Sequence, residues 1–377
     1  MGQSQHNTLR NMTETIAQQF RDAGHTADVY DLLSSTSVDQ LEAKFRDRAF
    51  DLMVAFQGWG LNFFDEGPNL FDRAQVPYIT ILGDHPMYHA SRLKHLSSRN
   101  AVLLLDADHV SFVQGLASCP VVAGPFALKD TADYGPRVPL SARDVPLLFM
   151  GSCGDPAAMR AELGKHPAVL RSILLETLEI KTESAPIRTT DALGNALAAR
   201  GIDHKLVPVL RRATMMESVD RIARAERRLR IIRGIRETPL TIWGPGWPDD
   251  IGAKRNVTLV PKGFPTGAAA AKRARVLLNI FQDEFAIFHD RCALAMCTWT
   301  PVLSDRTPAF VESYETLGRA FCYSDGPDID SVLTVRLHDD GWLDSIATEG
   351  HASVEAAPDS ASVNCILKAF RALLDTL

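Results

Sequence analysis

Residues 76–84 read VPYITILGD, an apolar run interrupted only by Thr80 that ends in a glycine and an aspartate. Similar short runs occur through the first third of the sequence: ADVYDL at 27–32, DLMVAFQG at 51–58, AVLLLDAD at 101–108 and CPVVAGPFAL at 119–128. Continuous apolar runs of this length, separated by helical patterns, indicate a parallel sheet that is covered on both faces. The sequence therefore predicts an α/β fold.

The same alternation returns in the second half of the chain. Residues 129–146 are rich in proline, glycine and charge, and the pattern from 156 to 236 is helical. Strand-like runs then recur at 239–247, 256–263, 273–282 and 319–325. Because 377 residues exceed one typical domain, we expect a first domain over 1–130, a linker over 131–146, a second domain over 147–345 with a helical segment at 156–236, and a terminal helix over 346–377.

Composition narrows the class of protein. The formal net charge of −6 and the sequence pI near 6.0 argue against a dedicated nucleic-acid binder, which needs a basic face. Nine arginines lie between 211 and 236, but Glu217, Asp220 and Glu226 are interleaved with them, which favours a solvated helix face. Six cysteines without paired spacing indicate thiols in a reducing compartment. Since we also find no signal-like or membrane-spanning apolar stretch, we expect a cytoplasmic protein.

Glycines and ionisable residues follow two expected strands of the first domain. Gly58 and Gly60 come directly after one strand, and Asp84 and His85 come after the next. An aspartate or histidine at such a strand end can act as a general base once its site adjusts its pKa. His89, four residues after His85, raises the alternative of a metal site, although no third ligand is evident. A purely structural loop is the remaining alternative.

Two loops with glycines follow expected strands of the second domain. Gly151 and Ser152 can form a turn whose backbone N–H groups face an anion. In WGPGW, Gly244 and Gly246 permit close backbone approach, and Trp247 can stack on a sugar or a base. The alternative for WGPGW is a tight turn with its tryptophan packed on its own domain.

The stretch HDRCALAMCTWTPVLSD at 289–305 predicts a helix followed by a buried strand. Its first three residues lie at the expected helix start, where backbone N–H groups and the helix dipole attract phosphate and Arg291 can make a two-pronged contact. The strand ends at Asp305, and the polar residues after it are expected at the same edge of the sheet.

These segments together resemble a known family. A strand ending in Asn279, the His-Asp-Arg triplet, a helix of small residues and PVLSD before Glu312 are similar to the donor half of GT-B glycosyltransferases, most closely to the spore-maturation CgeB-like group. FMGS at 149–152, Arg160 and WGPGW fit the same pattern, so the resemblance covers roughly 146–340. It implies two Rossmann-like domains facing a central cleft, with the terminal helix crossing back to the first domain.

The resemblance also implies a reaction. A hexosyl or hexosaminyl group would move from a nucleotide-diphosphate donor to a glycan, protein or small-molecule acceptor, with no cofactor and no obligatory metal. An inverting version would use Asp84 or His85 as base. The implied acceptor residues are Gly58, Gly60, Asn62 and His89. The implied donor residues are Gly151, Ser152, Gly244, Gly246, Trp247, Lys262, Asn279, His289, Asp290, Arg291, Asp305, Arg306, Thr307 and Glu312.

Two positions depart from the family pattern. Leu294 stands where many retaining relatives carry a glutamate seven residues before the proline of the Pro-Val strand, and bulky Trp299 replaces a small residue. The stereochemical outcome is therefore open. A nucleotide-sugar epimerase or hydrolase of the same fold, and a catalytically silent sugar-nucleotide-binding protein, are the alternatives.

Overall fold

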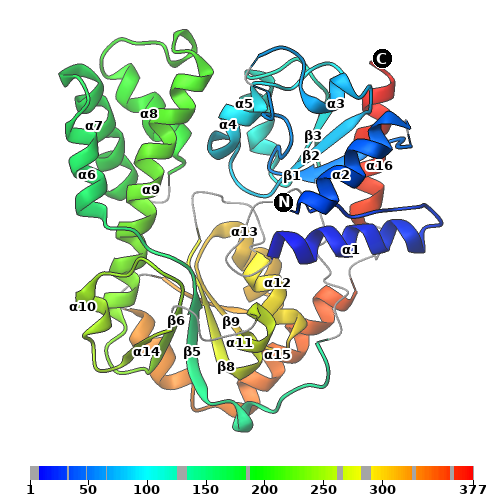
Figure 1. Ribbon diagram of the computed structural model, residues 1–377. Coiled ribbons are helices and arrows are strands. Elements are labelled where there is room, and N and C mark those ends of the chain that lie inside the picture. Colours follow the sequence, from blue (N-terminus) through cyan, green and yellow to red (C-terminus); the bar gives the residue numbers. More distant parts are fainter. Residues whose placement is uncertain are drawn as a thin grey trace. The chain divides into compact units, whose positions relative to one another are not determined.

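The computed structural model describes residues 8–31, 34–47, 49–64, 66–124, 134–183, 187–260, 266–281, 290–324, 328–356 and 361–376. The chain divides into two compact units (Figure 1). Unit 1 comprises Met1–Leu128, Lys205–Glu217 and Pro358–Leu377, and unit 2 comprises Lys129–His204 and Ser218–Ala357. Each unit holds one fully parallel sheet, which confirms the predicted fold class of two α/β domains. Their arrangement about a cleft stays a prediction.

Unit 1 contains a four-stranded sheet in the order β1 (Met53–Phe56), β2 (Tyr78–Leu82), β3 (Asn100–Leu104) and β4 (Val121–Ala123). Every residue of β2 and β3 is buried, as their continuous apolar sequences require. The edge strand β1 is only half-buried up to Phe56.

Helices cover both faces of this sheet. One face packs on α1 (Thr8–Asp22) and α16 (Ala361–Leu374). The other face packs on α3 (Leu70–Arg73), α4 (Ala90–Leu93) and α5 (Val110–Gln114). Unit 1 also contains α2 (Ser35–Arg46), η1 (Pro86–His89) and η2 (Ala107–His109).

The predicted strand at 27–32 is wrong. Residues 24–31 have no regular structure, although Val29 and Tyr30 are partly buried. A strand needs a neighbour to pair with, and within the described residues the strand that β1 pairs with is β2. Residues 25–30 instead line a cavity beside β1.

Unit 2 contains a six-stranded sheet in the order β10-β9-β8-β5-β6-β7. Its strands are β5 (Val145–Met150), β6 (Leu240–Trp243), β7 (Val257–Leu259), β8 (Ala274–Asn279), β9 (Val302–Asp305) and β10 (Phe321–Tyr323). The expected linker over 131–146 ends too late, because β5 begins at Val145, where the buried apolar run starts.

Helices of different lengths flank this sheet. They are η3 (Leu140–Ala142), α10 (Asp249–Gly252), α11 (Gly267–Arg273), α12 (Asp290–Cys297), α13 (Pro308–Phe310), the π-helix η5 (Val311–Glu315), α14 (Asp328–Arg336) and α15 (Asp340–Glu355). The expected single helix over 346–377 is therefore two helices, α15 and α16. The sequence places Pro358, a residue that interrupts helices, between them.

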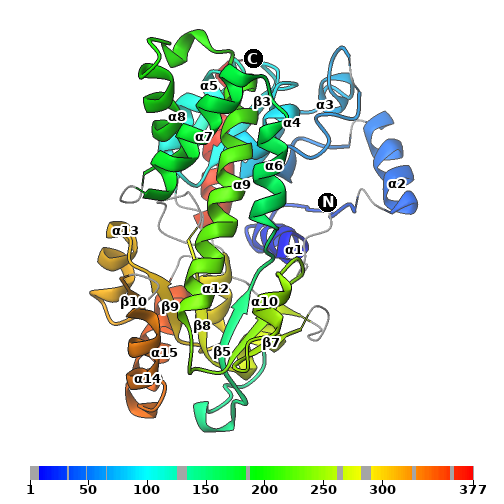
Figure 2. The same cartoon turned by 90° about the vertical axis from the view of Figure 1, so that its left-hand side faces the viewer.

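The predicted helical segment at 156–236 consists of α6 (Pro156–Gly164), α7 (Ala168–Glu183), α8 (Thr189–Ala198), the short η4 (His204–Leu206) and the long α9 (Val209–Gly234). Figure 2 shows α6, α7 and α8 beside α9. One face of α9 is buried through Val219, Ile222, Leu229 and Ile232. At the end of α16, Leu374 is half exposed.

Candidate functional site

The strand order of unit 2 defines a switch point in its sheet. Following the chain, the strands progress from β5 through β6 to β7 on one side, and then from β8 through β9 to β10 on the other side of β5. In open parallel sheets of this kind, ligands bind beyond the carboxyl ends of the strands where the order reverses. Those ends are Met150 of β5 and Asn279 of β8, and Gly151 and Ser152 follow the first of them.

Two glycine turns form one backbone layer above these strand ends. A Cβ built on Gly244 would lie 2.4 Å from the Gly151 carbonyl oxygen, and one on Gly246 would lie 2.3 Å from the Cys153 carbonyl oxygen. Both glycines have positive φ, 150° and 81°, so the turn needs glycine for two reasons. Gly151 N–H donates to the Trp243 carbonyl at 2.9 Å, which ties the two loops together.

Trp247 serves this turn. Its indole Nε1–H donates to the Gly151 carbonyl at 3.0 Å, and its ring packs edge to face on Phe149 with centroids 5.7 Å apart. Of the two interpretations offered for WGPGW, the structure therefore favours the turn with its tryptophan packed on its own domain.

Two arginines flank Phe149 at the end of β5. The guanidinium carbon of Arg291, from the first turn of α12, lies 5.5 Å from the centroid of the Phe149 ring, and that of Arg228, from α9, lies 6.0 Å away. Arg228 donates to the Ser152 carbonyl. A Cβ built on Gly151 would lie 3.7 Å from Arg291 Nη1, so Arg291 stands beside the glycine turn.

The charge of Arg291 is not fully compensated by its surroundings. Among the residues that the structure describes, its buried Nη1 has no hydrogen-bond partner. Burial lowers the pKa of the guanidinium, the Asp290 and Asp305 carboxylates oppose that shift, and the positive charge of Arg224 adds to it. An arginine is never neutral at physiological pH, so this group would gain from a bound anion.

A second arginine of α9 is held by an aspartate. Arg227 Nη2 lies 2.6 Å from Asp305 Oδ2, while Asp305 Oδ1 accepts the Phe281 N–H at 2.8 Å. Burial raises the pKa of the Asp305 carboxyl, and Arg227 and the Phe281 N–H oppose that rise. Asp305 thus anchors Arg227 and the chain leaving β8. In the same layer, Asn279 Nδ2 donates to Ser304 Oγ at 2.9 Å, and its buried Oδ1 has no partner among the described residues.

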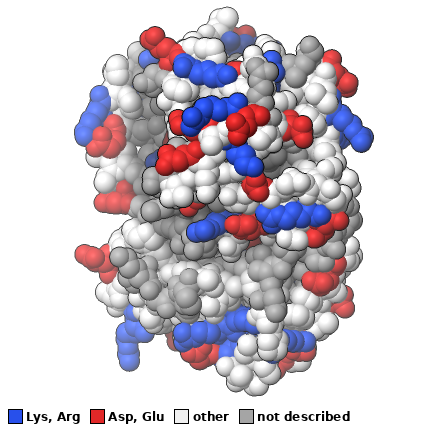
Figure 3. Space-filling model, turned by 45° about the vertical axis from the view of Figure 1, so that its right-hand side comes forward, with Lys and Arg blue, Asp and Glu red and all other residues white. Residues whose placement is uncertain are grey.

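The sequence pattern did not predict that arginines of α9 lie at the candidate site. Arg224, Arg227 and Arg228 are partly buried at the carboxyl edge of the sheet, so the solvated-face interpretation is wrong for these three. Asp220, which is fully buried, pairs with Arg224. The spacing of three and four residues places such side chains on one helix face, and that was the available signal. On the face of the molecule shown in Figure 3, Lys and Arg side chains lie among Asp and Glu side chains.

Other predicted donor residues have structural partners or fall outside the described residues. Thr307 caps α13 by accepting the Phe310 N–H at 3.3 Å, and the exposed Arg306 pairs with Glu315 at 2.9 Å. Glu312 is exposed in the π-helix, a feature common at functional sites. Lys262 and His289 lie outside the described residues.

In unit 1, the predicted residues gather at the carboxyl ends of β1 and β2. Gln57 Nε2 donates to Asp84 Oδ2 at 2.9 Å, and His89 Nε2 lies 3.8 Å from the same oxygen. Arg92 donates to His89 Nδ1 at 2.8 Å, which leaves the proton of a neutral ring on Nε2, toward Asp84. The Asp84 side chain is 48% exposed, so this carboxylate is positioned and also accessible.

His85 does not share that accessibility. It is buried, its Nδ1 accepts the Met87 N–H at 3.0 Å, and its ring lies 4.3 Å from that of His109. This lone pair caps η1, which fits a structural role better than the predicted role of base.

The predicted acceptor residues before β2 divide in a similar way. Gly58 donates to Thr80 Oγ1 at 2.7 Å with φ of 69°, and a Cβ on Gly60 would lie 2.6 Å from the Phe71 ring. Asn62 is exposed. Gly58 and Gly60 therefore shape the loop, while Asn62 is accessible.

The described part of the chain contains neither a metal-binding cluster nor a helix that could cross a membrane. No group of three or more His, Cys, Asp or Glu residues is arranged to hold a metal ion there. No helix there is long and apolar enough to span a bilayer.

Comparison with known proteins gives matches among solved structures and one family model. A search of curated proteins returns no match. Solved structures that match include sucrose-phosphate synthase from Thermosynechococcus elongatus (11% identity, 90% of this chain and 78% of that chain, TM-score 0.45) and the glycosyltransferase SnogD from Streptomyces nogalater (13%, 94% and 95%, TM-score 0.42). The spinosyn forosaminyltransferase SpnP also matches (12%, 96% and 96%, TM-score 0.41), and likenesses this distant carry no argument about function.

One family model matches part of the sequence. It is described as glycosyl transferase-like and covers residues 221–363, a range that includes Arg224, Arg228, Arg291 and Asp305 but not the Gly151 turn. Over residues 221–363 this chain is therefore similar to the glycosyl transferase-like family.

Proposed function

We propose that this protein is a glycosyltransferase that moves a sugar from a nucleoside-diphosphate donor to a hydroxyl group of an acceptor. The observation that carries the proposal is the pair Arg228 and Arg291, which both lie beside the Phe149 ring at the switch point of the unit 2 sheet. The glycosyl transferase-like match over the same region supports it.

The reaction needs stabilisation of a leaving diphosphate. An acceptor oxygen attacks the anomeric carbon, the bond from that carbon to the phosphate oxygen breaks, and the diphosphate leaves with the bonding electrons. Arginines and backbone N–H groups already aimed at the leaving group lower the barrier without reorganising. We assign Arg291, Arg228 and Ser152 to the diphosphate, whereas Gly151, whose N–H donates to the Trp243 carbonyl, shapes the turn. Asn279 Oδ1, which has no partner among the described residues, is assigned to a donor hydroxyl. Lys262, His289, Asp290 and Glu312 stay predicted donor residues.

The acceptor proton needs a base, and we assign that role to Asp84. Gln57 donates a hydrogen bond to one oxygen of its carboxylate, His89 Nε2 lies 3.8 Å from the same oxygen, and nearly half of the side chain is exposed. Asn62 and His89 are proposed to contact the acceptor. We do not assign His85 as the base, because its Nδ1 accepts the Met87 N–H and caps η1.

Finer features of the proposal follow the resemblance to the CgeB-like group. We propose transfer of a hexosyl or hexosaminyl group, with positive charge supplied by arginine so that no metal or cofactor is required. We also propose a cytoplasmic location, because all six cysteines are free thiols, as expected in a reducing compartment.

The test has two stages. Thermal shift with uridine, guanosine, thymidine and cytidine diphosphates, each beside its nucleoside, identifies the base and the need for phosphate. Nucleotide sugars that carry that base and a labelled sugar are then incubated with acceptor extracts and either the wild-type protein or the Arg291→Ala variant. Arg233→Ala is the matched control, because Arg233 lies on α9 in an exposed pair with Asp250.

We expect stabilisation by one diphosphate but not by its nucleoside, and labelled product that Arg291→Ala greatly reduces while Arg233→Ala does not. Release of free sugar at the same rate with and without acceptor would instead indicate a hydrolase. Binding without any turnover would indicate a silent binding protein. The absence of nucleotide binding, with Arg291→Ala indistinguishable from the wild type, would refute the proposal.

A further inference from the structure

The loop that follows β1 contacts Asp84 through its first residue and Arg92 through its third. Gln57 donates through Nε2 to Asp84 Oδ2 at 2.9 Å. The guanidinium of Arg92, from α4, lies over the ring of Trp59, with its carbon 5.0 Å from the ring centroid. Between these two residues, a Cβ built on Gly58 would lie 3.3 Å from the Cβ of Arg92. The loop therefore packs closely on Arg92, and glycine permits that approach.

The support beneath Arg92 is itself fixed. Tyr78 of β2 is fully buried, and its hydroxyl donates to the Trp59 carbonyl at 2.8 Å. Burial lowers the pKa of the Arg92 guanidinium and Tyr78 opposes that shift, but an arginine keeps its proton at physiological pH. A cation over an aromatic face is also attracted by the ring. Arg92 is thus held in place as a charged donor.

Arg92 determines where the proton of the His89 ring lies. Arg92 Nη2 is 2.8 Å from His89 Nδ1. Because a guanidinium has donors and no acceptor, His89 Nδ1 must accept this hydrogen bond and carries no proton while the contact lasts. The ring is then neutral, with its one proton on Nε2. Since Nε2 is buried and has no hydrogen-bond partner among the described residues, the contact with Arg92 is the one that selects this state there.

The state of His89 matters because its Nε2 faces Asp84. Nε2 lies 3.8 Å from Asp84 Oδ2, the oxygen that also accepts from Gln57. Among the described residues, the charged groups that contact His89 are Arg92, from α4, and Asp84, from the loop after β2. A carboxylate favours a positive charge on a neighbouring imidazole, and a positive imidazole would in turn lower the pKa of the carboxyl group and weaken it as a base. A neutral ring orients the carboxylate with an N–H dipole and avoids that loss of basicity.

We propose that Arg92 is a positioning residue, which keeps His89 uncharged beside the base Asp84. The catalytic consequence rests on the proposed function, in which Asp84 takes the acceptor proton, whereas the charge state of His89 does not. The proposal also gives the loop QGWG at 57–60 a role. Gln57 holds Asp84 directly, and Trp59 acts on it through Arg92 and His89.

The protonation of the ring is measured by nitrogen NMR on the full chain with isotope-labelled histidine, because protonated and unprotonated ring nitrogens differ widely in chemical shift. Spectra are recorded at about pH 6, where an ordinary histidine, with a pKa of about 6.5, is mostly charged. His89→Gln identifies the signals of His89 by their absence. We expect Nδ1 to be unprotonated in the wild type and in Arg92→Lys, which also donates without accepting, and protonated in Arg92→Met.

Activity supplies a second readout that a purely structural role would not change. Arg92→Met should lower kcat about tenfold at about pH 6 and by less than about threefold at about pH 8.5, where the ring loses its charge, and Arg92→Lys should recover most of the loss. The donor Kd should stay unchanged. Arg73→Met is the matched control, because Arg73 lies over the Phe64 ring at 3.7 Å and donates to the Pro68 carbonyl.

The outcomes that overturn the proposal are distinct from those that refute the proposed function. A protonated Nδ1 in the wild type at about pH 6, or an unprotonated one in Arg92→Met, would show that Arg92 does not control the charge of His89. An equal loss of kcat at both pH values would show that Arg92 is only structural. Absence of transfer by the wild type would refute the proposed function and with it the catalytic role of Arg92, while the spectra alone would still decide the charge of His89.

Discussion

Replacing Arg291 by methionine should affect the stability of the free protein and the affinity for a nucleoside diphosphate in opposite directions. The guanidinium is partly buried, and its buried Nη1 has no partner among the described residues. Methionine retains much of the apolar stem and removes the desolvated charge. A residue whose main role is to hold unit 2 together would instead lose stability and affinity in parallel.

The magnitudes follow from the contacts. Removing a buried, unsatisfied donor should stabilise the free protein by about 1–3 kcal/mol. Losing the contact between Arg291 and Phe149 should cost about 0.5–2 kcal/mol. The expected net effect on the free energy of unfolding is about +1 kcal/mol, or roughly 2–4 °C in Tm for a unit of this size. Losing a hydrogen bond to a charged ligand should weaken binding by about 1.5–3 kcal/mol, which is about 10- to 150-fold in Kd.

The assay combines chemical denaturation of the free protein with calorimetric titration of the nucleoside diphosphate that binds the wild type most tightly. Arg233→Met is the control, and both of its values should change by less than about 0.5 kcal/mol because its pair with Asp250 is exposed. A loss of more than about 2 kcal/mol of stability in Arg291→Met, or an unchanged Kd, would refute the reasoning.

Four further outcomes are expected. Gly244→Ala should lower the free energy of unfolding by about 1–3 kcal/mol, because the φ of 150° and the 2.4 Å approach to a carbonyl oxygen exclude a Cβ. Gly164→Ala, whose added Cβ would meet nothing within 4 Å, should not be destabilising, and thermal melts of the two variants make the comparison. Asp84→Asn should lower kcat by about 10²- to 10⁴-fold with little change in donor Kd. Steady-state kinetics with a separate donor titration would contradict the assignment if donor binding weakened, so that Kd rose as kcat fell. Burial raises the pKa of Cys119 and Cys322 to about 12, so the folded state holds these protons more tightly than the unfolded chain. The stability that the two thiols contribute is complete below about pH 8.5 and falls as the pH rises toward about 12. Alanine at both positions should therefore reduce the pH dependence of the free energy of unfolding, measured by denaturation between about pH 8 and about 10.5. Treatment with EDTA should leave transfer activity unchanged if arginine supplies the positive charge, and loss of activity that Mg²⁺ restores would contradict this.

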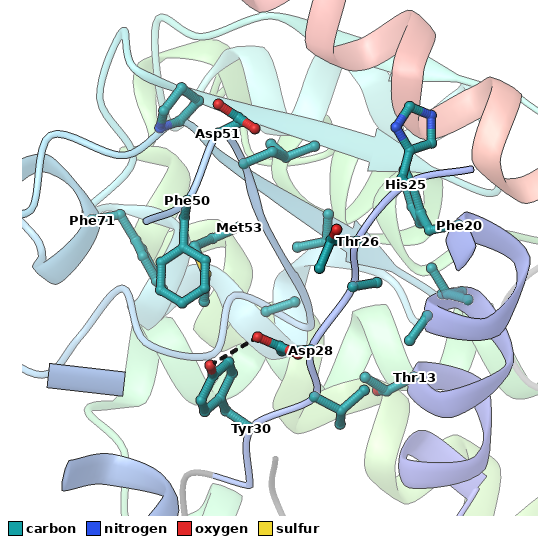
Figure 4. A pocket seen from close by; sticks show the side chains of 18 of the residues that line it. Thr13, Phe20, His25, Thr26, Asp28, Tyr30, Phe50, Asp51, Met53 and Phe71 are labelled. Atoms are coloured by element: carbon teal, nitrogen blue, oxygen red, sulfur yellow. Dashed lines mark hydrogen bonds between the residues drawn. The ribbon is translucent and has the colours of Figure 1, made fainter. Parts of the chain in front are cut away.

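Sequence patterns predicted the strands that are buried on both faces and failed where a strand lacked a neighbour. The runs that became β2 and β3 carry their own signal, because a strand covered by helices on both sides must be apolar throughout. ADVYDL has a similar composition, but pairing is a property of two segments, and this run lies across a cavity from β1 (Figure 4). The local sequence pattern therefore predicted the central strands of the sheet correctly but not its edge.

The candidate site divides along the same principle. Arg291 was predicted because its contact depends on one local feature, the start of a helix after a strand. Arg224, Arg227 and Arg228 depend on which face of α9 meets the sheet, and the interleaved acids concealed that face in the sequence. Asp220 and Asp305 are two such cases: they read as solubilising or ligand-binding charges, yet they pair with Arg224 and Arg227.

That pairing explains how the protein concentrates charge at one point. Asp220 compensates Arg224 and Asp305 compensates Arg227, whereas Arg228 donates to the neutral Ser152 carbonyl and Arg291 keeps a buried Nη1 unpartnered. Arg228 and Arg291 thus place two guanidinium groups beside the Phe149 ring and next to the glycine turn. Two positive charges held beside one turn match a diphosphate better than a single phosphate or a carboxylate. The affinity of a nucleoside diphosphate should therefore exceed that of the monophosphate in wild type, and Arg291→Met should remove most of that difference, because the second phosphate would then have lost its partner.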